Sequence, residues 1–185
     1  PTRLPAKTTS FKRWSEHLGE YAASDALVGE RAFWLSAIPE SVPALPLDFA
    51  GGRNLVGTAQ TVEVALTPEQ TRTLLQDVPK AYGTQINDVL LTALARSLAD
   101  WLASPTVLLN LEGHGREPVR DDVDVSRTVG WFTSMTPLAL AIDRGAGPGE
   151  SLKHVKEQLR RIPNRGLGYG VLKYLSPDAA TRAEI

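Results

Sequence analysis

The stretch from Asn110 to Pro137 constrains this chain most, because it joins a predicted buried strand to a loop crowded with charged side chains. The apolar run Val107 to Leu111 predicts a central strand. The hexapeptide EGHGRE at positions 112–117 follows it, and its two glycines let the backbone bend and approach a ligand closely. Two carboxylates, an imidazole and a guanidinium within six residues are costly to order in a loop, so the stretch indicates a functional site.

The composition is that of an ordinary globular domain, with 42% of the 185 residues hydrophobic and 22% charged. A formal net charge of −1 provides no electrostatic footprint for nucleic acid or an anionic membrane surface. The absence of cysteine excludes disulfides and thiolate metal sites. No apolar run approaches the roughly 18–20 residues of a membrane span, and the chain begins without the apolar segment of a signal peptide. We therefore expect a cytoplasmic protein without nucleic-acid or membrane partners.

Two helices and an irregular passage are predicted in residues 1–50. The first helix begins near Phe11 after a hydroxyl cap, and its apolar stripe comprises Phe11, Trp14, Leu18, Tyr21 and Ala22. The second runs from Ser24 to Ala37 with four inward residues, Leu27, Phe33, Trp34 and Leu35. Three prolines then exclude regular structure up to Asp48. We place a subdomain boundary here, so that residues 1–50 end one subdomain and residues 51–185 form the next.

The remainder alternates predicted strands with predicted helices, which is typical of a mixed α/β layered domain. Alternating apolar and polar residues predict a half-buried strand over Thr58 to Leu66. A helix is expected after the capping sequence Thr67-Pro68-Glu69-Gln70, up to Pro79. Another covers Ile86 to Leu102, with an apolar face made of Val89, Leu90, Ala93, Leu94, Leu98, Trp101 and Leu102. A third covers Ser151 to Ile162 and has a solvated basic face. A second strand is expected over Trp131 to Ile142. Gly166 to Gly170 should be a flexible loop before a short helix, Val171 to Leu175.

Glu112 has two interpretations. At the end of a strand it is poised for proton transfer in a cleft, or it pairs with Arg116 or Arg127 to hold the loop. His114 is a candidate base because the ordinary pKa of an imidazole lies near physiological pH. The other two histidines, His17 and His154, fall on surface-like helical faces. No pair has metal-ligand spacing, so we expect no metal site.

The three glycines in Gly166 to Gly170 superficially resemble a nucleotide-binding loop. A phosphate-binding loop of this kind follows a strand, whereas these glycines follow a helix and a proline. We therefore reject a nucleotide-binding role for them. Tyr169 either lines a pocket or packs in the core. The serines and threonines lack a nucleophile elbow.

Taken together, these segments resemble the epimerization domain of nonribosomal peptide synthetases, within the condensation-domain superfamily. The resemblance rests on five segments in order, over nearly the whole chain: SFKRW, DVLLTA at 88–93, EGHGRE at 112–117, RTVGWFTSMTP at 127–137 and PNRGLGYG at 163–170. It implies a fold like that of chloramphenicol acetyltransferase, in which a two-layer mixed sheet with helices forms two lobes around an active-site tunnel. Most of this chain would belong to the C-terminal lobe.

The chain departs from the family pattern in two respects. The HHxxxDG motif, which supplies a catalytic histidine from the N-terminal subdomain, does not occur in these 185 residues, and neither does an FNYLG-type segment. We therefore expect a fragment that needs the missing N-terminal subdomain as a partner and is inactive alone.

The resemblance implies inversion of the α-carbon, from L to D, of an aminoacyl or peptidyl thioester on a peptidyl carrier protein. The chain would hold no cofactor of its own, because the 4′-phosphopantetheine arm belongs to the carrier. Glu112 would be one of two proton-transfer groups. His114, Arg116, Arg127, Trp131, Phe132 and Tyr169 would shape the site or its substrate channel, with Arg116 pairing with Glu117 or with the absent motif's aspartate. Two alternatives stay open: a peptide-bond-forming condensation domain, and a non-catalytic carrier-docking remnant.

Overall fold

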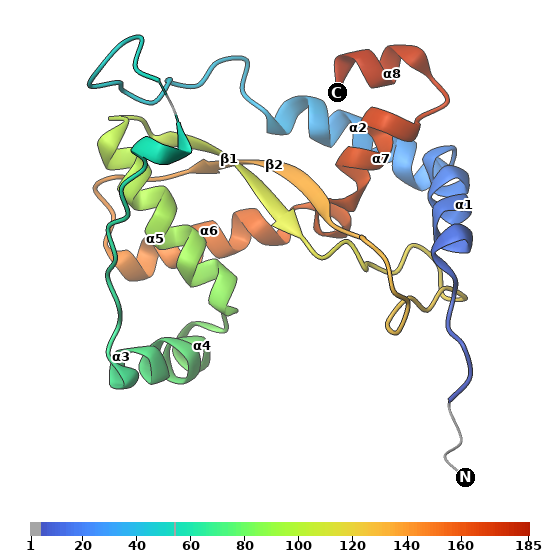
Figure 1. The fold of residues 1–185 in the computed structure, drawn as a ribbon, viewed down its shortest axis with the longest axis horizontal. Coiled ribbons are helices and arrows are strands. Elements are labelled where there is room, and N and C mark those ends of the chain that lie inside the picture. Colours follow the sequence, from blue (N-terminus) through green and yellow to red (C-terminus); the bar gives the residue numbers. More distant parts are fainter. Residues whose placement is uncertain (1–4, 54) are drawn as a thin grey trace. The chain divides into compact units, whose positions relative to one another are not determined.

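The computed structural model describes residues 5–53 and 55–185 (Figure 1). The chain forms two compact units. The first unit comprises Pro1–Glu40, Leu108–Ala139 and Arg160–Ile185, and the second comprises Ser41–Val107 and Leu140–Leu159. The boundary expected at residue 50 concerns the lobes of a larger protein and stays a prediction.

The described residues of the first unit form four α-helices: α1 (Phe11–Ala22), α2 (Asp25–Ala37), α7 (Leu167–Leu175) and α8 (Ala179–Glu184). The first two confirm the sequence prediction, since Ser10 and Ser24 cap them by accepting hydrogen bonds from backbone amides in the first turn. Helix α8 was not predicted. It is six residues long and depends on the Asp178 carboxylate, which accepts from two backbone amides and thereby caps it.

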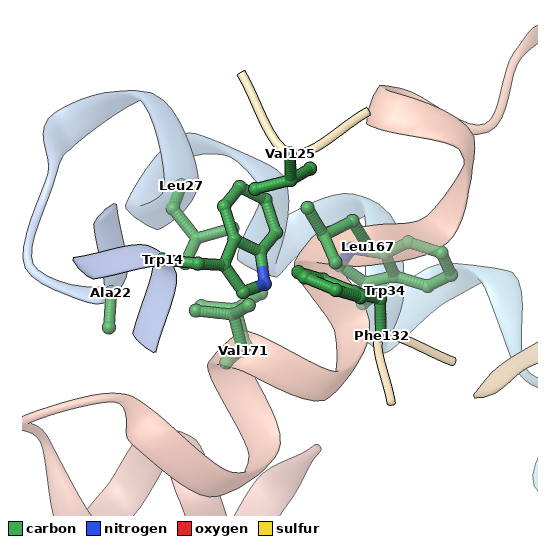
Figure 2. Packing of buried hydrophobic residues seen from close by; sticks show 9 residues of the cluster. Trp14, Ala22, Leu27, Trp34, Val125, Phe132, Leu167 and Val171 are labelled. Carbon is green, nitrogen blue, oxygen red and sulfur yellow. The ribbon is translucent and has the colours of Figure 1, made fainter. Parts of the chain in front are cut away.

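The core of the first unit forms where α7 packs against α1 and α2. Figure 2 shows the buried side chains of Trp14, Leu27, Trp34, Phe132 and Val171 in this cluster. Burying several aromatic side chains removes a large apolar area from water, which is the main favourable term in folding. The loop that carries Phe132 is thereby anchored to the helices.

Three side chains of α1 and α2 differ from expectation. Phe11 and Leu35 were expected to face inward, and both are exposed, at 44% and 41%. His17 was expected on the surface and is buried, with Nδ1 lying 3.2 Å from Glu20 Oε2. The sequence prediction counted only apolar residues at helical spacing as buried, and it therefore placed the polar ring of His17 on the surface. The ring can be buried because Glu20 on the same helix is its hydrogen-bond partner.

A buried carboxylate joins three parts of the first unit. Glu30 is only 8% exposed. It accepts hydrogen bonds from Tyr21 Oη at 3.2 Å, Trp34 Nε1 at 3.2 Å and Asn164 Nδ2 at 2.6 Å. A buried charge needs such donors to offset the loss of water. The cluster therefore ties α1, α2 and the turn before α7 together.

That turn has an unusual backbone. Asn164, Arg165 and Gly166 have φ values of 44°, 51° and 88°, so three consecutive residues are left-handed in the short 3-10 segment η3 (Pro163–Gly166). Left-handed backbone costs a non-glycine residue roughly 1–2 kcal/mol, and asparagine tolerates it best. Gly166 O accepts a hydrogen bond from Thr136 Oγ1 at 3.1 Å, which helps to fix the turn.

The flexible loop predicted over Gly166 to Gly170 is wrong beyond its first residue, because α7 begins at Leu167. Gly168 serves packing here, whereas Gly170 does not. A Cβ on Gly168 would lie 2.0 Å from Glu30 Oε2, whereas one on Gly170 would meet nothing within 4 Å. Glycine at position 168 thus lets α7 approach the buried carboxylate.

The two strands are β1 (Thr106–Gly113) and β2 (Ser134–Ala141), which form a two-stranded sheet. They are antiparallel, since Ile142 N donates to Pro105 O at one end and Gly113 lies against Ser134 at the other. The strand predicted over Val107 to Leu111 is confirmed, but its central position is not, because within the described residues β1 pairs with β2 alone. The second strand begins at Ser134 instead of Trp131 and ends at Ala141, and Phe132 just before it lies against Gly115 of the EGHGRE loop.

The second unit is organised around α5 (Ile86–Trp101) and α6 (Pro148–Arg160). Both predicted helices are confirmed. Arg96 on α5 donates to Ala146 O at 2.8 Å and also to Ser151 Oγ on α6. The expected apolar face of α5 is wrong, because it buries its small residues Thr92, Ala95 and Ala99 and leaves Leu90, Leu94 and Trp101 exposed. Small side chains let a helix approach its neighbours closely.

The helix predicted after Thr67 is present but interrupted. Thr67 and Gln70 form the expected capping box for α3 (Pro68–Arg72). A π-helical turn, η2 (Thr73–Asp77), then leads into α4 (Val78–Tyr82). Pro79 lacks a backbone N–H and cannot make a regular helical hydrogen bond, and a π turn is one way for a helix to accommodate this.

The strand predicted over Thr58 to Leu66 is wrong within the described residues. Only the 3-10 turn η1 (Val56–Thr58) is regular there, and residues 59–66 are extended and exposed. Val62 and Val64, the apolar half of the alternation, are 90% and 95% exposed. A strand exists only through hydrogen bonds to a neighbour, and no described segment pairs with this one.

We expect Gly168→Ala to destabilise the intact protein by about 1–3 kcal/mol, because the added methyl group collides with the Glu30 carboxylate. Gly170→Ala is the matched control on the same helix and should be neutral or slightly stabilising. The measurement is the free energy of unfolding in urea. Equal values for the two variants would contradict the close approach of α7 to Glu30.

The Tyr21 hydroxyl gives a prediction at alkaline pH. Burial, together with the neighbouring Glu30 carboxylate, raises the pKa of Tyr21 from 10.0 to about 12. The neutral phenol therefore stabilises the fold fully below pH 10, and this contribution is lost as the pH rises from 10 through about 12. Tyrosinate absorbance should show one late-ionising group that Tyr21→Phe removes, and Tyr21→Phe should flatten the loss of stability across that window.

Candidate active-site loop

Strand β1 delivers Glu112 to its carboxyl end, as the sequence predicts. Asn110 and Glu112 are exposed on the face opposite the buried Val107. Among the described residues the Glu112 carboxylate forms no hydrogen bond or ion pair, so the interpretation that it pairs with Arg116 or Arg127 is wrong. The cleft expected around it stays a prediction. The carboxylate is free to meet a group presented from outside the chain.

Gly115 presses the EGHGRE loop onto the segment that precedes β2. Its φ of +65° lies in the left-handed region, and a Cβ there would lie 1.6 Å from Phe132 O. Only glycine fits this contact without moving the backbone. The bend predicted from the two glycines of the loop is thus required at position 115.

Arg116 holds the loop by its guanidinium group. It donates to Val125 O and, at 2.9 Å, to Thr128 O, and its Cζ lies 4.0 Å from the ring centroid of Phe132. The planar fork of donors suits two carbonyl oxygens and an aromatic face at once. The expected pairing of Arg116 with Glu117 is wrong, because these carbonyls occupy the guanidinium.

Glu117 instead lies between two other side chains. Its Oε1 is 3.4 Å from His114 Nε2 and its Oε2 is 3.5 Å from Arg165 Nη1, and the carboxylate side chain is only 15% exposed. His114 Nδ1 accepts a hydrogen bond from Arg116 N at 3.0 Å. A ring nitrogen that accepts carries no proton, so the neutral imidazole holds its proton on Nε2, toward Glu117.

Arg127 lies away from this group. It is exposed and donates to Ala6 O at 3.1 Å. The hydroxyl of its neighbour Thr128 donates to Thr9 O and therefore accepts from Thr8 Oγ1, at 2.9 Å. This segment therefore ties the chain before α1 to the loop, which is a structural role.

The three aromatic candidates, Trp131, Phe132 and Tyr169, lie in different environments. Trp131 is 81% exposed and Phe132 is 8% exposed, as expected for neighbours in extended backbone. Both line a groove of about 450 Å³ between α1 and α7, whose lining also includes Gly115 and Tyr174. Tyr169 is not part of it. Its ring packs on Trp34 with centroids 5.4 Å apart, so the core interpretation of Tyr169 is confirmed.

A second cavity of about 370 Å³ lies beside the loop, and the turn 123–126 faces His114 and Glu117 across it. Hydrogen bonds from Ser126 lower the pKa of the Asp124 carboxyl on this turn. Neither cavity includes Glu112. The described residues hold no group of three metal-ligating side chains, and none of their helices is long and apolar enough to cross a membrane.

Sequence reasoning missed two residues of the His114 group, Glu117 and Arg165. Glu117 was quoted in the hexapeptide but considered only as a partner for Arg116. Arg165 lies 48 positions further along, and it is brought to Glu117 by the left-handed turn. The available signal was the Asn-Arg-Gly sequence after Pro163, since asparagine and glycine both favour left-handed backbone.

The family that these features define is identified by comparison. The family described as Condensation domain matches residues 1–184. The chain belongs to the condensation-domain family, as the resemblance predicts.

Two solved structures share this fold. The epimerization domain from the third module of tyrocidine synthetase B is 42% identical with a TM-score of 0.86, over 95% of this chain and 39% of that one. The first condensation domain of the calcium-dependent antibiotic synthetase is 22% identical with a TM-score of 0.68, over 94% of this chain and 37% of that one, and shows the shared fold alone. The mixed helix-and-strand fold class is thus confirmed.

Among curated proteins, one of the linear gramicidin synthase polypeptides of Brevibacillus parabrevis is 53% identical over 97% of this chain. The chain spans 2% of that polypeptide's length. It is thus comparable to a small part of one large peptide synthase.

We expect Arg116→Lys to destabilise the intact protein by about 1.5–3 kcal/mol, because an ammonium group cannot serve two carbonyls and an aromatic face together. Arg127→Lys is the matched control, since the exposed Arg127 makes a single hydrogen bond to a backbone carbonyl. Urea unfolding measures both. A loss for Arg127→Lys as large as that for Arg116→Lys would contradict the structural role of the Arg116 fork.

Proposed function

We propose that this chain is part of an epimerization domain, which inverts the α-carbon of an aminoacyl or peptidyl thioester held on a carrier protein. The likeness to the tyrocidine epimerization domain supports this proposal most directly, because 42% identity and a TM-score of 0.86 exceed the 22% and 0.68 of the condensation domain described above. The EGHGRE loop supports it independently through the placement of Glu112.

The chemistry needs a proton acceptor and a proton donor at one carbon atom. A thioester acidifies the adjacent C–H bond, and removing that proton leaves a planar enolate. A proton returned to the opposite face inverts the centre. Two groups on opposite sides of the α-carbon serve this better than one, because neither has to cross the plane.

Glu112 is suited to be one of these groups. It ends a strand, which is a rigid element, and its carboxylate is exposed and unpaired among the described residues. A carboxylate already engaged by an arginine would be a weaker proton acceptor. In the proposed domain, a surface outside these residues closes over Glu112, excludes water and supplies the second group.

The other charged residues of the loop do different work. The guanidinium groups of Arg116 and Arg127 donate to backbone carbonyl oxygens. Both residues would therefore stabilise the backbone around the site without contacting the substrate. His114 faces Glu117, with its ring 64% exposed. Its ring nitrogens are engaged by Glu117 and by the Arg116 amide, so we assign it to shaping the loop. The hydrogen bonds that the enolate oxygen needs as charge develops on it would come from other donors. The substrate arm would be the phosphopantetheine of a peptidyl carrier protein, in the cytoplasm.

We predict that Glu112→Gln in the intact epimerization domain reduces α-proton exchange of a carrier-bound aminoacyl thioester by at least about 100-fold, as expected for loss of a general acid–base group. Glutamine keeps the shape and the exposure of the side chain, so the fold should persist. The measurement is loss of α-deuterium from the loaded carrier, followed together with the thermal unfolding midpoint.

Glu40→Gln is the control, since Glu40 is also an exposed carboxylate in the same chain. It should exchange the α-proton at the wild-type rate. Normal exchange in Glu112→Gln would refute the role of Glu112. If the wild-type domain forms a peptide bond between the acyl groups of a donor and an acceptor carrier, and does not invert the aminoacyl group of a single loaded carrier, its activity is condensation instead.

A further inference from the structure

The PNRGLGYG segment has no role in the proton transfer described above, although it contains the most strained backbone of the first unit. Asn164 and Arg165 are non-glycine residues with φ values of 44° and 51°. Such residues persist in left-handed backbone only where the surroundings hold them, and they cluster at functional sites. The first question is what holds them.

Glu30 holds Asn164. Its Oε1 accepts from Asn164 Nδ2 at 2.6 Å, and the same amide nitrogen lies 2.8 Å from Tyr21 Oη. Glu30 is buried, with no cation among its described partners, so these neutral donors alone satisfy it. Hydrogen bonds to a charged acceptor are among the stronger ones in proteins.

Arg165, the residue after Asn164, connects the left-handed turn to the EGHGRE loop. Arg165 Nη1 lies 3.5 Å from Glu117 Oε2, although the arginine side chain is 75% exposed. Little packing directs so exposed a side chain, so its direction depends on the backbone of the turn. Glu117 in turn faces His114 Nε2, while Arg116 N binds His114 Nδ1. Both ring nitrogens are thereby held.

We propose that Glu30 is a positioning residue: by holding Asn164 it fixes the left-handed turn, which places Arg165 where it keeps Glu117 against the imidazole of His114. The link runs within the first unit, from a buried carboxylate of α2 to the candidate active-site loop. Its effect on catalysis rests on the proposed function, whereas its effect on the loop does not.

The backbone amide of Arg116 reports on the loop without any assay of activity, because its hydrogen-bond acceptor is the His114 ring. We would measure amide hydrogen exchange in the intact protein for Asn164→Gly and Arg165→Gln. Asn164→Gly keeps the left-handed backbone available and removes only the amide donor. Arg165→Gln keeps the backbone cost and removes the charge.

Both variants should exchange the Arg116 amide about two- to tenfold faster, the range that corresponds to one net hydrogen bond. Arg161→Gln is the matched control, an exposed arginine just before the turn, and should leave this amide unchanged. Wild-type exchange in Asn164→Gly and Arg165→Gln overturns the proposal. Glu30→Gln should behave like Asn164→Gly, and if it unfolds, the other two variants still decide.

Kinetics test the same link on catalysis. Arg165→Gln should lower kcat for α-proton exchange with KM unchanged, and should have no further effect in a Glu117→Gln background, because it acts through Glu117. Additive losses overturn the link. Arg165→Lys, which restores the charge, should recover part of the rate, and no recovery counts against it. Absence of exchange in the wild-type domain refutes the proposed function, while the amide measurement still decides the positioning role.

Discussion

The first unit depends on one buried carboxylate. Glu30 accepts hydrogen bonds from α1, from its own helix and from the turn before α7, and the close approach of α7 is possible because position 168 is glycine. A carboxylate removed from water is costly unless every lone pair finds a donor. Its partners are therefore constrained together: a change in any one of them disturbs the others, and with them the packing of three helices.

The charged residues of the EGHGRE loop divide into scaffold and free groups. Arg116 donates to two carbonyl oxygens and lies over the Phe132 ring, and these contacts couple the loop to the aromatic core. Glu117 is shared between an imidazole and a guanidinium. Glu112 alone among these charged groups has no partner in the described chain. A carboxylate held on a rigid strand but free of ion pairs is available for proton exchange.

Much of this organisation was predictable from sequence, and the reasons for the failures are physical. Helix caps such as Ser10 and Ser24 act within a few residues, so α1 and α2 began where expected. The position of Glu112 near the end of β1 followed from a simple apolar run. Partners far apart in sequence carry no local signal, so the Asn-Arg-Gly sequence could indicate the left-handed turn but not the links of Glu30 to Asn164 and of Glu117 to Arg165. The glycines of PNRGLGYG indicated flexibility, whereas Gly168 provides contact with a carboxylate.

The extended segment at residues 59–66 has a consequence for handling this chain. Its backbone donors and acceptors have no ladder partner in the described chain, and Val62, Val64 and Leu66 present a β-branched and apolar row to solvent. An uncovered row of this kind is a template on which other chains add, the first step of cross-β association. Produced by itself, the polypeptide would tend to self-associate through this row, and a solubilising charge at position 62 or 64 would counter that tendency.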